Sequence, residues 1–301
     1  MITLAGFALS IVSHIVLVYY QGMSMEGRLP DWVPIMVGVN YFVYIFLDNV
    51  DGKQARRTHS SSVLGMLVDH GCDAYTSVIV ACNLTMVVQA GLSEYSILPC
   101  FVSTIPFFFA TLESYFIGGV YLPEINAVSD GCIAYMFVCF GTVYLGYEEL
   151  TALKNGNMRI SHYSAYAFIP ASIIFTLQNI YCIFFKEKRV RKGNIRAVSK
   201  AVLYVLITSF ILNYCGNCFP ESMLKTAPLL VSYLFGLLLL RPINLMQLHL
   251  VTAQPMNLWR RGSILTLIIL MITHVYADSL GVGIREAIVI YSVLIIFNLY
   301  L

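Results

Sequence analysis

Residues 48–56 read Asp-Asn-Val-Asp-Gly-Lys-Gln-Ala-Arg, and the polar pattern continues with Gly65, Asp69 and Asp73. This stretch lies between two apolar runs, residues 32–47 and 77–88. Ionised carboxylates are costly in apolar surroundings unless a cation or another partner compensates their charge. The stretch therefore indicates a charged site at a membrane boundary, and it predicts that this site holds a metal ion.

Helical periodicity places these residues on two faces. Positions 48, 51, 52 and 55 follow the i, i+3, i+4, i+7 rule, and positions 65, 69 and 73 lie one helical turn apart. Two helices joined by residues 57–62 would bring four carboxylates together, those of Asp48, Asp51, Asp69 and Asp73. Mg²⁺ and Mn²⁺ prefer oxygen ligands of this kind. The small residues of the pattern would keep the cleft between the helices open: Gly52, Ala55 and Gly65.

A cluster that only pairs with nearby basic residues is the alternative explanation. Lys53, Arg56 and Arg57 are close enough in sequence to form such pairs at a helix end. However, the pattern has eight specified positions, and at about 5 to 7% frequency each a chance match is rarer than about one in a billion per starting point. We therefore interpret the pattern as a functional site.

Composition independently indicates an integral membrane protein. The chain has 301 residues, of which 58% are hydrophobic and 11% charged, whereas soluble domains carry about 25% charged residues. Ten apolar runs approach the length that spans a bilayer: 2–20, 32–50, 66–90, 96–118, 127–147, 160–185, 198–217, 226–247, 262–277 and 283–301. Helices satisfy their own backbone in lipid, so the sequence predicts an all-α polytopic membrane protein with about ten transmembrane helices.

Basic residues predict the orientation of these helices. They concentrate in two connections, residues 53–57 and 186–200, which should both face the cytosol. An even number of spans then places both termini on that side as well. The first run, residues 2–20, lacks a basic n-region and a clear cleavage site, so we read it as a retained span. The net charge of +2 argues against nucleic acid as a partner.

The complete pattern, D-x2-D-G-x2-A-R-x8-G-x3-D-x3-D, resembles the signature of the CDP-alcohol phosphotransferase family at every specified position. The strings DGKQARR at 51–57 and DHGCD at 69–73 resemble the choline/ethanolamine phosphotransferase branch. The region that contains Glu113 and Asn126 is similar to that branch too. The length of the chain beyond the motif also favours it.

The resemblance implies a reaction and a set of roles. Phosphoethanolamine or phosphocholine would pass from CDP-ethanolamine or CDP-choline to diacylglycerol, with release of CMP. Mg²⁺ or Mn²⁺ would be held by four carboxylates, those of Asp48, Asp51, Asp69 and Asp73. Asp73 would also be the catalytic base for the acceptor hydroxyl. The nucleotide would contact Gly52, Ala55, Arg56 and Gly65. Further candidates for the site are Lys53, His70, Glu113 and Asn126.

The resemblance also implies how the chain is organised and where it works. Residues 1–185 would form the CDP-alcohol phosphotransferase catalytic membrane core, and residues 186–301 would add C-terminal transmembrane helices that provide a dimer contact. We expect a multi-pass homodimer in the lipid bilayer of the endoplasmic reticulum, with its active site facing the cytosol. The Golgi membrane is the second choice. Head-group selection depends on pocket shape, so choline and ethanolamine both stay open.

Two departures from the family pattern keep alternatives open. Met66 stands where relatives usually carry a glutamate after the glycine equivalent to Gly65. The start, Met1-Ile-Thr3, resembles the middle of a family Pro-Asn-Leu-Ile-Thr string, so we expect both ends to be shortened. A truncated, non-catalytic isoform that associates with active copies is one alternative. A membrane transporter is another, although we find neither inverted repeats nor interrupted helices in matching halves.

Overall fold

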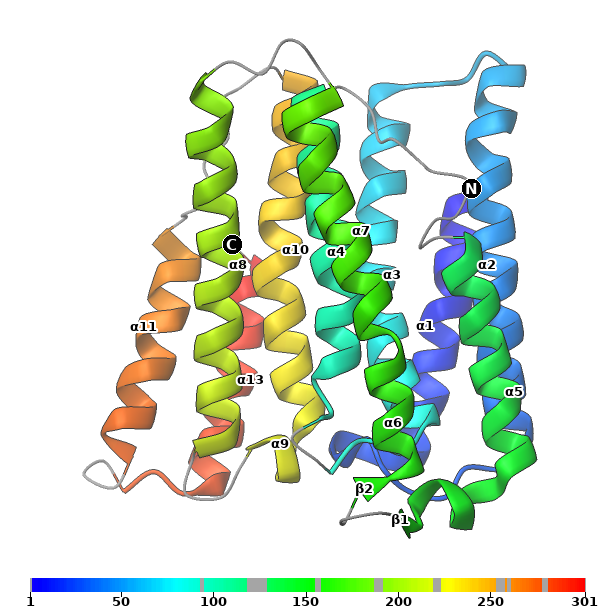
Figure 1. The fold of residues 1–301 in the computed structure, drawn as a ribbon, viewed down its shortest axis with the longest axis vertical. Helices are drawn as coiled ribbons and strands as arrows, with labels where there is room; N and C mark the ends of the chain where they lie inside the picture. Colours follow the sequence, from blue (N-terminus) through cyan, green and yellow to red (C-terminus); the bar gives the residue numbers. More distant parts are fainter. Residues whose placement is uncertain are drawn as a thin grey trace.

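The computed structural model describes residues 2–92, 95–117, 129–154, 158–186, 192–218, 223–252, 258, 261–277 and 281–300. In these ranges the chain forms a bundle of long helices that run along one common axis (Figure 1). The strands in these ranges are a short antiparallel pair, β1 (Leu153–Lys154) and β2 (Met158–Arg159). The architecture therefore confirms the predicted all-α fold.

The helices have the following bounds in chain order: α1 (Ile2–Gln21), η1 (Gly22–Ser24), α2 (Trp32–Arg57), α3 (Val63–Val87), α4 (Leu98–Ile117), α5 (Ser129–Thr151), α6 (Ile160–Ala167), α7 (Ile169–Tyr181), η2 (Cys182–Lys186), α8 (Lys192–Cys218), α9 (Met223–Thr226), α10 (Pro228–Thr252), α11 (Arg261–Val275) and α13 (Ile284–Tyr300). In the described residues, each predicted apolar run lies mainly in helices.

Length and composition identify fewer membrane-crossing helices than we predicted. Six helices in the described ranges are long and apolar enough to cross a membrane, namely α1, α2, α4, α5, α8 and α10. The predicted count of ten is thus not confirmed. The difference has physical causes, because α3 carries aspartates near its start, and α11 and α13 have only 15 and 17 residues. In addition, the predicted span 160–185 is divided between α6 and α7.

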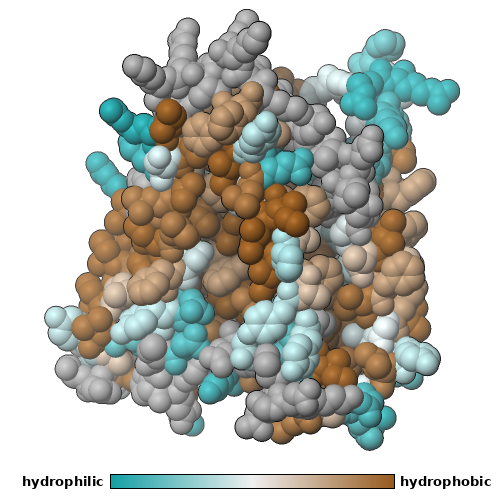
Figure 2. Space-filling view, in the orientation of Figure 1, coloured by the Kyte–Doolittle hydropathy of each residue, from teal (hydrophilic) through white to brown (hydrophobic). Residues whose placement is uncertain are grey.

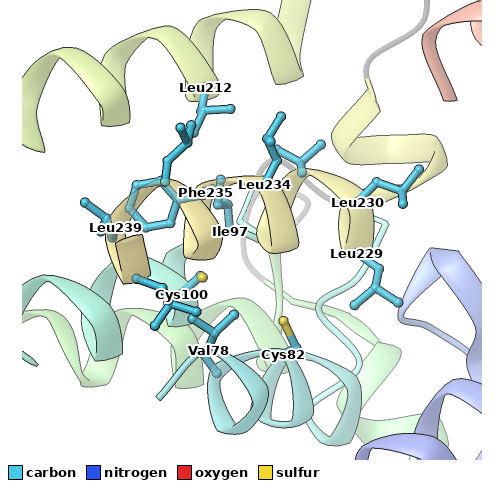
Figure 3. Packing of buried hydrophobic residues seen from close by; sticks show 14 of the residues in the cluster. Val78, Cys82, Ile97, Cys100, Leu212, Leu229, Leu230, Leu234, Phe235 and Leu239 are labelled. Atoms are coloured by element: carbon cyan, nitrogen blue, oxygen red, sulfur yellow. The ribbon is translucent and has the colours of Figure 1, made fainter. Parts of the chain in front are cut away.

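Helix α10 lies at the centre of the packing. In its most apolar window 72% of residues are buried, compared with 22% for α1. It packs against α3, α4, α8 and α13, and Figure 3 shows its leucines and Phe235 among Val78, Cys82 and Cys100 of α3 and α4. Helices on both sides of the predicted boundary at residue 185 thus share one hydrophobic core, and the two-part organisation stays a prediction.

A glycine sets the distance between α10 and α3. A Cβ atom at Gly236 would lie 2.5 Å from Cγ1 of Val78, closer than side chains approach one another. Small residues at helix contacts in membranes allow backbones to come close, and packing then supplies the association energy. Gly236 therefore allows α10 to pack closely against α3, the helix that carries Asp69 and Asp73.

The exposed surface is apolar around the middle of the bundle. In Figure 2, hydrophobic side chains cover much of the middle of the visible face, and hydrophilic ones gather towards its ends. Large apolar side chains on the outer helices are strongly exposed, among them Ile174 and Leu177 of α7 and Leu206 and Phe210 of α8. In water this would be unfavourable, but it matches a helix bundle that faces lipid.

The segments expected to carry the basic residues meet at one end of the bundle. The turn from α2 to α3, the end of α7, the start of α8 and the end of α10 all lie at the upper end of Figure 1. Lys53, Arg56 and Arg57 belong to the last turns of α2. This arrangement agrees with the prediction that the two basic connections lie on the same side.

Candidate metal centre and active site

The turn between α2 and α3 sets the position of the acidic residues. Ser62 caps α3, because its Oγ accepts a hydrogen bond from the backbone N–H of Gly65 at 3.0 Å. A Cβ atom at Gly65 would lie only 3.1 Å from Ser62 Oγ and would crowd this cap. Gly65 thus has a structural role in starting α3, and Asp69 and Asp73 follow one and two turns later.

Three of the four predicted carboxylates converge. One oxygen from each of Asp48, Asp51 and Asp69 lies within 4.8 Å of the others, and all three side chains are half-buried. Oδ1 of Asp69 is buried and accepts no hydrogen bond from the described part of the chain. Three negative charges at this separation repel one another unless a cation lies between them. The oxygen-only donor set and the unsatisfied buried oxygen fit a divalent metal ion.

Asp73 lies beside this group, contacts the side chain of Asp48 and has a further partner outside the group. Its Oδ1 accepts a hydrogen bond at 2.5 Å from the hydroxyl of Tyr44, which comes from α2. Its charge interacts with those of Asp48 and Asp69 nearby. The structure therefore puts Asp73 next to the three-carboxylate group, while its roles as metal ligand and catalytic base stay predictions.

Helix α1 supplies a part of the site that sequence spacing did not reveal. The hydroxyl of Thr3 donates a hydrogen bond to Oδ2 of Asp51. One turn later, Gly6 lies against the ring of Tyr44, where a Cβ atom would be 3.2 Å from Cδ2. The residue spacing within the acidic motif could not identify Thr3, because Thr3 belongs to another helix. Spacing could have identified Tyr44, since it lies one turn before Asp48 on the same face of α2.

The predicted nucleotide-binding residues surround the end of α2. Gly52 and Ala55 are half-buried, whereas Lys53 and Arg56 are exposed. A Cβ atom at Gly52 would lie 3.5 Å from Nη1 of Arg56, so the guanidinium group lies over this glycine. The arrangement places a cationic, multidentate donor over the glycine that follows Asp51, which suits a phosphate-containing ligand.

The remaining candidates are more scattered. His70 is half-buried on α3, directly after Asp69, and Met66 is 36% exposed one turn earlier. Glu113 is fully buried in α4. Asn126 lies outside the described residues. Catalytic or binding roles for His70, Glu113 and Asn126 stay predictions.

Comparison with known proteins agrees with this geometry. A family model described as CDP-alcohol phosphatidyltransferase matches residues 1–118, which include the whole acidic motif. The chain is 32% identical over 273 residues to "Uncharacterized CDP-alcohol phosphatidyltransferase class-I family protein 3" of Dictyostelium discoideum, an alignment that covers 81% of this chain and 68% of that protein.

Two further relatives have functional names. Identity to choline/ethanolaminephosphotransferase 1 of Arabidopsis thaliana is 32% over 253 residues, covering 77% of this chain and 62% of that protein. Identity to ethanolaminephosphotransferase 1 of Homo sapiens is 27% over 253 residues, covering 78% and 62%. The chain spans less than two thirds of the length of these two relatives. Since the motif, its carboxylate geometry and the match to the Dictyostelium protein all agree, the chain belongs to the CDP-alcohol phosphatidyltransferase family.

Proposed function

We propose that this chain transfers phosphoethanolamine or phosphocholine from CDP-ethanolamine or CDP-choline to diacylglycerol. The acceptor hydroxyl oxygen forms a bond to the phosphorus that carries the head group, the bond from that phosphorus to CMP breaks, and the hydroxyl proton leaves to a base. The observation that carries the proposal is the convergence of Asp48, Asp51 and Asp69 within the complete family motif. Relatives named as choline and ethanolamine phosphotransferases support the choice of substrates.

A divalent cation, Mg²⁺ or Mn²⁺, is part of the proposal. Asp48, Asp51 and Asp69 would hold it, and Asp73 would complete the ligand set. When bound, the metal offsets negative charge on the diphosphate and on the leaving CMP. Without metal, the half-buried carboxylates would repel an anionic donor, so the same residues explain both metal dependence and substrate binding.

Asp73 is the proposed base. One of its oxygens, Oδ1, accepts a hydrogen bond from Tyr44, and we assign acceptance of the proton from the acceptor hydroxyl to the other oxygen, Oδ2. Arg56 would bind a donor phosphate through its guanidinium group, and Gly52 and Ala55 would leave room for the nucleotide. A direct displacement of this kind needs no covalent phosphoenzyme.

The location of the site suits one soluble and one membrane-bound substrate. Diacylglycerol would reach the carboxylates laterally from the bilayer, while the CDP-alcohol would enter from the water at the end where Lys53, Arg56 and Arg57 lie. We place this end in the cytosol by the positive-inside rule. The endoplasmic reticulum membrane is the proposed location, with the Golgi membrane as second choice, and the proposed assembly is a homodimer.

The first experiment is a membrane assay. The chain is expressed in cells that lack this activity, and membranes are supplied with diacylglycerol, Mg²⁺ or Mn²⁺, and labelled CDP-ethanolamine or CDP-choline. An Asp73→Asn variant serves as the matched control. Labelled phospholipid from the parent alone supports the proposal and identifies the head group. No product from folded parent protein with either donor rejects these substrates for this chain.

A further inference from the structure

The hydrogen bond between Tyr44 and Asp73 connects the carboxylate site to the packing of the helix bundle. We propose that Tyr44 is a positioning residue that fixes the orientation of the Asp73 carboxylate, and that α1 keeps Tyr44 in place. The proposal rests on the proposed function, because it assigns Tyr44 to the same site. It adds to that function a residue outside the acidic motif.

Burial makes the hydrogen bond hard to replace. The Tyr44 side chain is only 4% exposed, and its hydroxyl donates to Oδ1 of Asp73 at 2.5 Å. Hydrogen bonds from a hydroxyl to a carboxylate are short and about twice as strong as neutral ones. With one oxygen held in this way, the carboxylate cannot rotate freely. The other oxygen, Oδ2, therefore keeps a defined direction for the proton transfer proposed above.

The ring of Tyr44 is itself held by its neighbours. Gly6 of α1 packs against one edge, at a distance where even a methyl group would press on Cδ2. On α2, Tyr41 is stacked with Tyr44 at 6.1 Å between ring centroids, and it contacts Tyr135 of α5 at 4.8 Å. Residues of α1 and α2 thus contact the ring directly and α5 supports it through Tyr41, so the hydroxyl is preorganised before any substrate binds.

The carboxylate that Tyr44 holds is the one outside the compact group. The three oxygens that lie within 4.8 Å of one another belong to Asp48, Asp51 and Asp69, whereas the Tyr44 hydroxyl bonds to Asp73. Asp48, Asp51 and Asp69 would still hold the cation when this hydroxyl is lost, even though Asp73 completes the proposed ligand set. The loss should therefore impair the step that uses Asp73 as a base more than it impairs cation binding. This difference separates a positioning role from a general contribution to folding.

The test compares Tyr44→Phe with Tyr41→Phe. Tyr41→Phe is a matched control, because it keeps the ring that stacks on Tyr44 and removes only a hydroxyl that makes no hydrogen bond to an aspartate among the described residues. We expect Tyr44→Phe to lower kcat by about tenfold to a hundredfold, with KM and the Kd for Mn²⁺ (from electron paramagnetic resonance) changed less than about threefold. We expect Tyr41→Phe to keep kcat. Equal kcat in both variants, or a loss of Mn²⁺ affinity as large as the loss of kcat, overturns the proposal.

Gly6→Ala tests the role of α1 and needs no change at Tyr44. The added methyl group should press on the ring and lower kcat by about twofold to tenfold, a smaller effect than removal of the hydroxyl. In the Tyr44→Phe background it should have almost no further effect, because the hydrogen bond is already gone. If the losses of kcat from the two substitutions multiply in the double variant, Gly6 does not act through Tyr44.

A chemical readout separates this proposal from the proposed function. Membranes without substrate or metal are treated with dicyclohexylcarbodiimide, and labelling of Asp73 is followed by mass spectrometry. We expect Asp73 to be labelled several-fold faster in Tyr44→Phe than in the parent or Tyr41→Phe, because an oxygen is released from its hydrogen bond. If the parent makes no phospholipid but shows this difference, the proposed substrates fail and the positioning role stands. Equal labelling in all three proteins overturns the positioning role.

Discussion

The hydroxyl of Thr3, in the first turn of α1, donates a hydrogen bond to Oδ2 of Asp51 on α2. Asp51 is one of three carboxylates that converge, so a residue 48 positions earlier in the chain orients part of the candidate metal centre. Groups that hydrogen-bond to metal ligands fix the direction of the ligand oxygens. The first helix is therefore a part of the site and not only a membrane anchor.

Thr3→Val removes this donor and keeps the shape of the side chain. We expect the Kd for Mn²⁺ to rise by about tenfold, within the range seen when partners of metal ligands are removed. Thr3→Ser keeps the hydroxyl and is the matched control, with affinity close to that of the parent. Mn²⁺ titration followed by electron paramagnetic resonance gives both values. Equal affinity of the parent and Thr3→Val would show that the hydrogen bond does not serve the metal.

The cluster of three carboxylates predicts that one substitution has opposite effects on thermal stability in the absence and in the presence of a metal ion. In EDTA, Asp69→Asn should unfold at a higher temperature than the parent, because it removes one of three repelling charges. With Mn²⁺ at about one hundred times Kd, the parent should gain about 2.7 kcal/mol, while Asp69→Asn should gain much less. Thermal unfolding in detergent with EDTA or Mn²⁺ measures this crossover. If Mn²⁺ raised the unfolding temperature of both proteins equally, the metal would have to bind elsewhere.

The close approach of α10 to α3 predicts a steric effect. Gly236→Ala puts a Cβ atom 2.5 Å from Val78 Cγ1 and should destabilise the bundle by about 1–3 kcal/mol. Gly141→Ala is a matched control, because a Cβ atom at Gly141 of α5 meets nothing within 4 Å. Val78→Ala should recover part of the loss in a double variant. Unfolding in denaturant measures these differences, and equal stability of the two glycine variants would argue against the packing.

A buried polar network predicts a second contribution to stability. Nδ1 of His14 lies 2.6 Å from Oδ1 of Asn83, and its Nε2 is hydrogen-bonded to the hydroxyl of Tyr233. The network joins α1, α3 and α10, so His14→Leu should deprive the buried Asn83 and the half-buried Tyr233 of this partner and cost about 1–3 kcal/mol. Tyr233→Phe removes one bond and should cost about 0.6 kcal/mol, as is common in membranes. Unfolding free energies test this order, and a costlier Tyr233→Phe would contradict it.

Much of the site could be predicted from local spacing, and the remainder depends on contacts between distant helices. Asp48 and Asp51 share a face of α2, and Asp69 follows a capped turn, so helical periodicity was sufficient to predict that they converge. Thr3 joins them only because α1 packs against both α2 and α3. No pattern within one helix contains that information.

The length of the apolar runs predicted the fold class better than it predicted the number of spans. Continuous apolar runs indicate helices because lipid does not satisfy backbone groups, and the described residues of every predicted run lie mainly in helices. Hydropathy says less about where a helix is interrupted, as between Ala167 and Ile169, where α6 ends and α7 begins. It also does not show which apolar helix becomes central, and α10 takes that position through its contacts with α3 and α4.

The most direct test uses purified protein in liposomes that contain diacylglycerol. CDP-ethanolamine or CDP-choline is added with Mn²⁺, and CMP and phospholipid are measured together for the parent and for Asp48→Asn. We expect equal amounts of CMP and phospholipid from the parent, and neither from Asp48→Asn or in EDTA. Folded parent protein that releases no CMP with either donor, or product formation that persists in Asp48→Asn, would contradict catalysis by this carboxylate site.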